Sequence, residues 1–300
     1  MFDNLKKYLN TDFEKELYTE AINNLNSKSR IRFCNFAYVM RELLDIVLER
    51  LADDSTVMNT PWYIREREDR KVTRNQRLKY ILQGAFDDRY INQILNYDIN
   101  PAIIELNKYI SVLSKHTHIR EKTFNYSDTE VDKHVKEFRV TIDGFIQEIG
   151  ILKQNIARLL LDILEEPIRE AFMDELPFEL DCLSTHTTID YWNIEDVEIT
   201  NITTEKILGT ISGTVEITLQ YGSDGDCSRD IGATMDDSYP FSSNFEIEVP
   251  NINKLVEELN LEEEDIIEDY YDDLKGLFIQ EVLNNHIVEY PIINTNSFYE

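Results

Sequence analysis

The sequence predicts an α+β protein, with an N-terminal helical bundle followed by a small antiparallel β-sheet module and acidic C-terminal helices. Up to about residue 180, apolar residues recur every three or four positions, which is typical of amphipathic helices. After Pro177, apolar and polar residues alternate, as in a strand with one buried face. We therefore expect a helical domain over residues 1–180 and an α+β module over residues 181–300.

The first helices are indicated by apolar spacing and by capping residues. Residues 2–26 predict two short helices, and Asp12 is placed to cap the second. Residues 30–53 predict a core helix, because their apolar side chains fall on one helical stripe. The members of that stripe are Phe33, Phe36, Ala37, Met40, Leu43, Leu44, Val47 and Leu51. Thr73 is expected to cap a further helix that starts at Arg74.

Two longer helices are expected in the second half of the helical domain. One covers residues 101–116 and begins with proline, a favoured residue of the first helical turn. The other runs over residues 129–173 and is capped by Ser127 or Asp128. We expect Pro167 to kink this helix or to divide it, because proline lacks the amide hydrogen that a helix interior uses.

Strands are expected over residues 187–197, 205–221 and 245–249. The alternation is clearest in GTISGTVEITLQYG, which has a regular apolar side and a polar side. The composition of GSDGD at residues 222–226 predicts a turn. Residues 252–286 predict an amphipathic helical segment whose outer face is acidic.

The composition is that of a folded protein, because 42% of its 300 residues are hydrophobic and can bury a sizeable core. No apolar run approaches the length of a membrane span, and the N-terminal segment lacks the apolar core and cleavage site of a signal peptide. We expect a cytoplasmic protein with no membrane partner.

The net charge of −28 limits which nucleic-acid contacts are available. Affinity for nucleic acid depends mainly on neutralising phosphates with lysine and arginine, so a strongly acidic surface repels it at long range. Part of the excess is local, because residues 257–273 hold ten acidic side chains and no basic one. A role on nucleic acid therefore needs a local positive patch.

One segment reverses the sign of the charge. Between residues 65 and 79, seven basic side chains stand against three acidic ones. These seven are Arg65, Arg67, Arg70, Lys71, Arg74, Arg77 and Lys79. Arginine beside aromatic residues suits phosphate and base contacts, so we predict that this basic segment binds nucleic acid. The alternative is that these side chains pair with the acidic surface of the same protein.

Two histidines and an arginine lie at the end of the helix predicted over residues 101–116 and directly after it. His116, His118 and Arg120 combine groups that move protons with a group that stabilises a phosphate. A histidine near a helix C-terminus is favoured in its protonated form by the helix dipole. We predict that these three residues cleave RNA without a metal ion. Helix capping without chemistry is the alternative interpretation.

Metal and cofactor chemistry has little support in the sequence. It contains no P-loop, dinucleotide-binding glycine fingerprint, nucleophile elbow or zinc-protease signature. Asp190, Asp196 and Glu216 are candidates for a two-metal nuclease, but no lysine stands two positions after Glu216. An acidic loop that includes Asp236 offers oxygen ligands, although such loops are usually only solvated. We expect no metal site and no cofactor.

Two pairs of segments resemble known families. RFCNFAYVMRELLDIVLE together with LSKHTHIREKTF resembles the HEPN-like helical domains of prokaryotic defence and toxin proteins. GTVEITLQYGSDGD followed by DDSYPF resembles the C-terminal module of the family called predicted pPIWI-associating nucleases, found in bacterial antiviral islands. HEPN ribonucleases place an arginine before the histidine on one helix and usually complete the site across a dimer. Here the arginine, Arg120, comes after His116 and His118.

These observations lead to a hypothesis of function. We expect a bacterial anti-phage defence component that acts on nucleic acid as a metal-independent ribonuclease, with RNA as its partner and a homo-oligomer as its assembly. The main alternative is a non-catalytic sensor or adaptor that binds a phage protein or a partner subunit through its acidic surfaces. A third alternative is mimicry of DNA by regularly spaced carboxylates.

Overall fold

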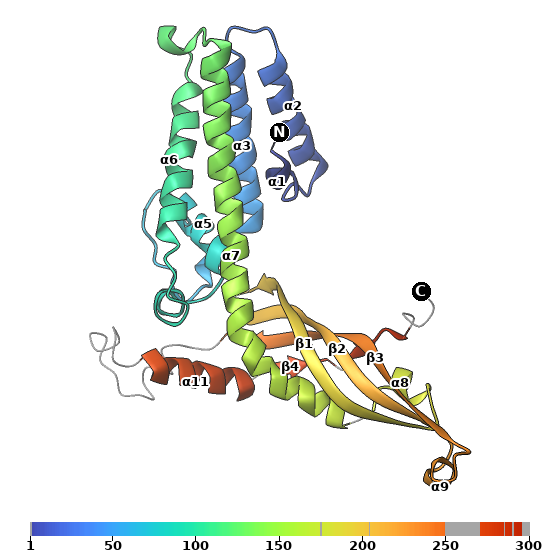
Figure 1. Cartoon of the computed structure of the whole chain (residues 1–300). Helices are drawn as coiled ribbons and strands as arrows, with labels where there is room; N and C mark the ends of the chain where they lie inside the picture. Colours follow the sequence, from blue (N-terminus) through green and yellow to red (C-terminus); the bar gives the residue numbers. More distant parts are fainter. Residues whose placement is uncertain are drawn as a thin grey trace. The chain divides into compact units, whose positions relative to one another are not determined.

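The structure is a computed structural model that describes residues 2–174, 176–203, 205–249, 271–284, 286–289 and 291–295 (Figure 1). The chain forms two compact units. The helical unit comprises Met1–Asn92 and Asn96–Leu152, and the sheet unit comprises Gln93–Leu95 and Lys153–Glu300. The predicted α+β class is confirmed. The boundary predicted after residue 180 falls within α8 (Phe178–Asp181), which belongs to the sheet unit.

The helical unit contains the helices that the apolar spacing predicts. Its elements are α1 (Asp3–Lys6), α2 (Asp12–Asn26), α3 (Arg32–Leu51), α4 (Asp54–Met58), α5 (Arg74–Gln83), α6 (Asn100–His116) and the first part of α7 (Asp128–Asp174). A short 3-10 helix, η2 (Glu121–Thr123), lies between α6 and α7. α7 contributes residues 128–152 to the helical unit and residues 153–174 to the sheet unit. It continues through Pro167 as one helix, so of the two outcomes expected there the division is wrong.

Hydroxyl side chains cap three of these helices. The Thr11 hydroxyl accepts a hydrogen bond from the Glu14 amide, so Thr11 caps α2 in place of the expected Asp12. The Thr73 hydroxyl accepts from the Gln76 amide in the same way, which confirms the predicted start of α5. Ser127 caps α7, because its hydroxyl accepts from the amide three residues later. Each cap satisfies an amide that lacks a partner within the helix.

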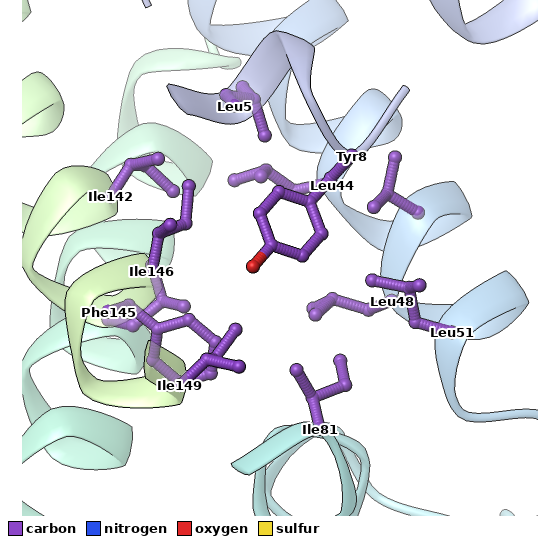
Figure 2. Close-up of a pocket in the computed structure, with 12 residues that line it drawn as sticks. Leu5, Tyr8, Leu44, Leu48, Leu51, Ile81, Ile142, Phe145, Ile146 and Ile149 are labelled. Carbon is purple, nitrogen blue, oxygen red and sulfur yellow. The ribbon is translucent and has the colours of Figure 1, made fainter. Parts of the chain in front are cut away.

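The core of the helical unit forms where the apolar faces of α3, α6 and α7 pack against one another. α3 buries nearly the whole predicted stripe, from Phe33 to Val47. Within this core lies a small apolar cavity of about 40 Å³, which Figure 2 shows with twelve lining residues. All but one of these residues are aliphatic or phenylalanine, and the exception is Tyr8, whose hydroxyl points into the cavity (Figure 2). Burial raises the pKa of Tyr8.

The sheet unit contains an antiparallel sheet in which three long strands are joined by two short ones. Its strands are β1 (His186–Ile202), β2 (Lys206–Tyr221), β3 (Ala233–Glu248), β4 (His286–Val288) and β5 (Ile292–Ile293). They pair in the order β1-β2-β3-β4, and β5 also pairs with β3. The predicted strands are thus present; β2 matches its expected range closely, whereas β1 and β3 are longer than expected. The turn after β2 includes α9 (Asp224–Cys227). Of the acidic segment at residues 252–286, residues 252–270 lie outside the described ones, and α11 (Tyr271–Asn284) is described.

One face of the sheet is packed through glycine and phenylalanine pairs. Gly209 lies opposite Phe245 and Gly213 lies opposite Phe241, so each ring fills the space above a glycine on the neighbouring strand. The ring of Phe172, on the sheet-unit part of α7, meets Phe241 edge to face at a centroid distance of 5.1 Å. This contact places the helix on the apolar side of the sheet and leaves the other side polar.

Among the helices in the described ranges, none has the length and apolar character needed to cross a lipid bilayer.

Candidate active site

The last turn of α6 presents His116 to the interior of the helical unit. Its side chain is buried, with 9% relative exposure, because it continues the apolar stripe formed by Tyr109 and Leu113. His116 Nδ1 and the Tyr126 hydroxyl lie 3.3 Å apart, within hydrogen-bond distance. The end of α6 therefore inserts an imidazole among aromatic side chains.

A second histidine, His134, meets His116 from the second turn of α7. The two ring centroids lie 5.1 Å apart. The ring of Phe33, on α3, stacks on His134 at 5.1 Å and meets the edge of His116 at 5.0 Å. Tyr126 closes the group, with its ring centroid 5.5 Å from that of His116 and 5.6 Å from that of His134. We call these four residues the histidine cluster.

The environment of the histidine cluster affects its protonation. Burial lowers the pKa of His116, and the neighbouring His134 and Lys115 lower it further. The helix dipole was expected to favour protonated His116, but burial outweighs it and favours the neutral imidazole. Burial also raises the pKa of Tyr126, with Cys34 and Glu130 adding to the effect.

One ring nitrogen of His134 lacks a hydrogen-bond partner among the described residues. Its side chain is 24% exposed, and Glu137 Oε2 lies 3.6 Å from its Nδ1, an ion-pair distance when the ring is protonated. This separation is too long for a hydrogen bond, and Nδ1 has no hydrogen-bond partner within the described part of the chain. A buried polar atom without a partner is uncommon and points to a site where another group binds or reacts.

The two remaining predicted residues lie in the loop after α6. His118 and Arg120 are exposed, and their side chains make no hydrogen bond or ion pair with the described residues. The loop backbone is held by Thr123, whose hydroxyl accepts a hydrogen bond from the Arg120 amide at 2.9 Å. The structure thus brings His116 together with His134. His118 and Arg120 follow His116 closely in the sequence, but their side chains are exposed to solvent.

Sequence reasoning missed His134. The available signal was its place on the buried stripe of α7, three residues after Val131 and four before Phe138, both of which are buried. The preceding helix, α6, ends in His116. A histidine on the buried stripe of the next helix is therefore a candidate to contact His116.

The arginines of α5 are paired within the protein. Arg74 donates to Asp45 Oδ1 from two nitrogens, at 3.1 and 2.9 Å. Arg77 lies 2.6 Å from Asp54 and 3.7 Å from Glu49, and its side chain is only 14% exposed. These contacts tie α5 to the end of α3 and to α4, so both guanidinium groups serve to join helices.

The rest of the basic segment is mostly paired as well. Arg67 and Arg70 both contact Asp69, at 2.9 and 3.3 Å. Lys79 lies 2.6 Å from Asp88. Five of the seven basic side chains, counted over these pairs and those of Arg74 and Arg77, thus have carboxylate partners. This arrangement matches the alternative of pairing within the protein.

Two members of the basic segment have no ion pair with the described residues. Arg65 donates to the backbone carbonyls of Arg67 and Glu68, at 3.1 and 2.9 Å. Lys71 is exposed. The binding of nucleic acid by this segment stays a prediction.

The polar face of the sheet holds the acidic candidates. The Thr218 hydroxyl lies 2.7 Å from Asp190 Oδ2 and 3.2 Å from Asp236 Oδ1, so the two carboxylates flank one side chain of β2. Over the ranges that the structure describes, no group of three or more His, Cys, Asp or Glu residues is arranged to hold a metal ion.

Comparison with known families accounts for most of the chain. Two domain models, each described as "Predicted pPIWI-associating nuclease", match residues 6–139 and residues 150–266. The chain belongs to the family of predicted pPIWI-associating nucleases. No match was found among curated proteins or among solved structures.

In this predicted pPIWI-associating nuclease, the first matched range contains the whole histidine cluster and the second contains β1, β2 and β3. The resemblance to predicted pPIWI-associating nucleases is therefore confirmed, and the family match also covers the helical unit. The family description fits a protein that acts on nucleic acid. The HEPN-like character of the helical unit stays a prediction.

Proposed function

We propose that this chain is a component of bacterial anti-phage defence that cleaves RNA without a metal ion. The observation that carries the proposal is the pairing of His116 with His134, at a centroid distance of 5.1 Å, in a member of a predicted nuclease family. Two imidazoles in different surroundings supply the base and the acid that cleavage of a phosphodiester needs.

The proposed reaction uses the 2′-hydroxyl of RNA as nucleophile. Neutral His116, whose pKa is lowered by burial, takes the proton of this hydroxyl. The 2′-oxygen bonds to phosphorus while the bond from phosphorus to the 5′-oxygen breaks, and protonated His134 gives its proton to that leaving oxygen. The products are a 2′,3′-cyclic phosphate and a 5′-hydroxyl. DNA is not a substrate, because it lacks the attacking hydroxyl.

The exposed loop completes the proposed site. The Arg120 guanidinium stabilises the charge that develops on the phosphate, and His118 contacts the same phosphate. Both side chains are exposed and without a partner among the described residues, so substrate reaches them without breaking an internal contact.

The test is incubation of the purified protein with labelled RNA in the presence of a chelator. We expect cleavage to persist and to fall by about 100-fold or more in the His116→Ala and His134→Ala variants, as for loss of an acid or a base. His118→Ala and Arg120→Ala test the loop. His186→Ala is the matched control, because His186 lies on β1 in the sheet unit.

The outcomes separate the proposal from its competitors. Cleavage that is unchanged in both His116→Ala and His134→Ala overturns the histidine mechanism. Cleavage that needs added magnesium moves the site to the carboxylates around Thr218. RNA that is never cut by folded protein overturns the ribonuclease proposal.

A second candidate function is the non-catalytic adaptor. It is favoured by the ion-paired basic segment together with the net charge of −28, since both leave acidic surface as the main feature open to partners. Such an adaptor binds a phage protein or a partner subunit and cuts nothing. Folded protein that neither binds nor cuts RNA, and that forms a stable complex with a basic protein, supports this candidate.

A further inference from the structure

A groove of about 660 Å³ runs between α6 and α7 in the helical unit. The two helices lie side by side in Figure 1, and the Tyr109 hydroxyl on α6 donates to the backbone carbonyl of His134 on α7. Three lysines line the groove: Lys108 from α6, and Lys133 and Lys136 from α7. None of them belongs to the segment that the sequence marks as basic.

These lysines are available to a ligand. Lys108 is 70% exposed and lies 3.4 Å from Glu105, and Lys133 is 73% exposed and lies 4.0 Å from Glu137. Lys136 is exposed and makes no ion pair with the described residues. Exposed ion pairs within one helix are weak, so a phosphate displaces them at little cost.

The charge of the groove differs from that of the whole chain. Its lining holds three lysines and two glutamates, a net charge of +1, whereas the chain carries −28. Arg74 and Arg77 differ in kind from these lysines, because their side chains are only 32% and 14% exposed and bind carboxylates at 2.9 and 2.6 Å. A polyanion approaching the helical unit therefore finds exposed, weakly paired positive charge in the groove.

The groove and the histidine cluster are built from neighbouring turns of α6 and α7. Val112 lines the groove, and His116 follows it by four residues on the same face of α6. Lys133 lines the groove from the other side and is adjacent to His134 in sequence. Val140, which is 60% exposed, adds an apolar surface among the lysines.

We infer that this groove binds the phosphate backbone of single-stranded RNA and directs it to His116 and His134. The inference rests on the proposed ribonuclease function. The three lysines neutralise successive phosphates, and Val112 and Val140 contact the ribose or base faces that a single strand leaves open. A double helix is a poorer ligand, because its stacked bases cannot reach the apolar floor.

The test measures binding apart from cleavage. Fluorescence anisotropy follows the titration of labelled 2′-O-methyl RNA, which cannot be cleaved through its 2′-oxygen, at several salt concentrations. The test variant is Lys108→Gln, Lys133→Gln, Lys136→Gln. The control variant is Lys7→Gln, Lys15→Gln, Lys28→Gln, which changes the net charge equally at exposed positions outside the groove.

We expect the test variant to bind more weakly than the control and its salt dependence to be shallower. The slope of log affinity against log salt should fall by about 2, because each phosphate contact on a single strand contributes about 0.7. The control should keep the wild-type slope.

Equal RNA binding by the two variants, or no RNA binding by the wild type, would overturn the proposal that the groove binds RNA. Preferential displacement of RNA by polyglutamate would also overturn it, because it would indicate a binding site for acidic protein. If the wild type binds ordinary RNA tightly but does not cleave it, the groove proposal stands and the proposed ribonuclease function is overturned. If only the histidine variants lose cleavage and the lysine variant binds RNA like the wild type, the groove proposal is overturned and the ribonuclease proposal stands.

Discussion

The imidazole of His116 lies 5.1 Å from that of His134, between ring centroids, and is shielded from water by Phe33 and Tyr126. Burial, followed by the neighbouring His134 and Lys115, lowers the pKa of His116 and favours its neutral imidazole. This relationship has a consequence for stability as well as for chemistry.

Stability should fall as the pH falls below about 6.5, the ordinary pKa of histidine. Because the folded-state pKa of His116 is lowered, the unfolded chain binds more protons in the range between the folded and unfolded values. Stability from this source is therefore complete above the unfolded pKa and is lost as the pH drops towards the folded pKa. Urea unfolding at several pH values between 5 and 8 measures it.

His116→Gln should remove this part of the pH dependence of stability, because the glutamine side chain does not titrate between pH 5 and 8. His118→Gln reports the effect of losing an exposed imidazole in the same segment. Parallel pH profiles for the wild type and His116→Gln would contradict the assignment.

The helices and the sheet were predictable because their signals are local. Thr73 before Arg74 predicts the start of α5, and the alternation of GTISGTVEITLQYG predicts β2; both are confirmed. The registers were not predictable. That Gly213 meets Phe241 depends on how a turn of several residues aligns two strands, which the apolar pattern of one strand does not encode.

The candidate site was only half predictable for the same reason. His116 stands out at the end of a helix, but His134 joins it only through the packing of α7 on α6 and α3. The pairing of Arg74 with Asp45 likewise depends on α5 meeting α3, across 29 residues of sequence. Composition shows that the segment is basic, whereas tertiary packing decides whether its charge is free.

Glu14 is a second buried group with a testable role. It is 1% exposed, caps α2 by accepting from the amides of Asn10 and Thr11, and accepts from Arg50 Nε at 2.6 Å. Burial raises the pKa of Glu14, but these hydrogen bonds outweigh it and hold the pKa below its ordinary value. Glu14→Gln should lower the free energy of unfolding at pH 7 by about 2 kcal/mol, because it breaks a largely buried ion pair.

The loss in Glu14→Gln should shrink as the pH falls. The wild-type carboxylate contributes stability that is present above its unfolded pKa and is lost as the pH drops through the lower folded value. Urea unfolding of both proteins at pH 7 and at pH 3 measures the difference. Equal destabilisation at both pH values would show that the hydrogen bonds to Glu14 do not depend on its charge.

Gly213→Ala should destabilise the sheet unit. A Cβ atom at this position would lie 2.0 Å from the Asn193 carbonyl oxygen and 2.8 Å from Phe241 Cε1, so the strands must shift. We expect a loss of about 2–3 kcal/mol in the free energy of unfolding, typical of overpacking.

Gly144→Ala is the matched control, because Gly144 lies in α7 with no atom within 4 Å of an added Cβ. There alanine should add about 0.5–1 kcal/mol through its higher helix propensity. Thermal unfolding of the two variants should therefore shift in opposite directions, and a shared direction would contradict the packing described.

Tyr8→Phe should stabilise the helical unit. The Tyr8 hydroxyl points into the apolar cavity of about 40 Å³, and it makes no hydrogen bond with the described residues (Figure 2). Tyr8 is half-buried, so its hydroxyl is partly desolvated without gaining a hydrogen bond, and its removal should raise the free energy of unfolding by about 0.5–1 kcal/mol. Tyr18→Phe is the control, because the Tyr18 hydroxyl accepts a hydrogen bond from the Phe2 amide at 3.4 Å. Its loss should lower stability by about 1 kcal/mol. If Tyr8→Phe is destabilising in urea unfolding, the Tyr8 hydroxyl makes a stabilising polar contact in the folded protein, and this account of the cavity is wrong.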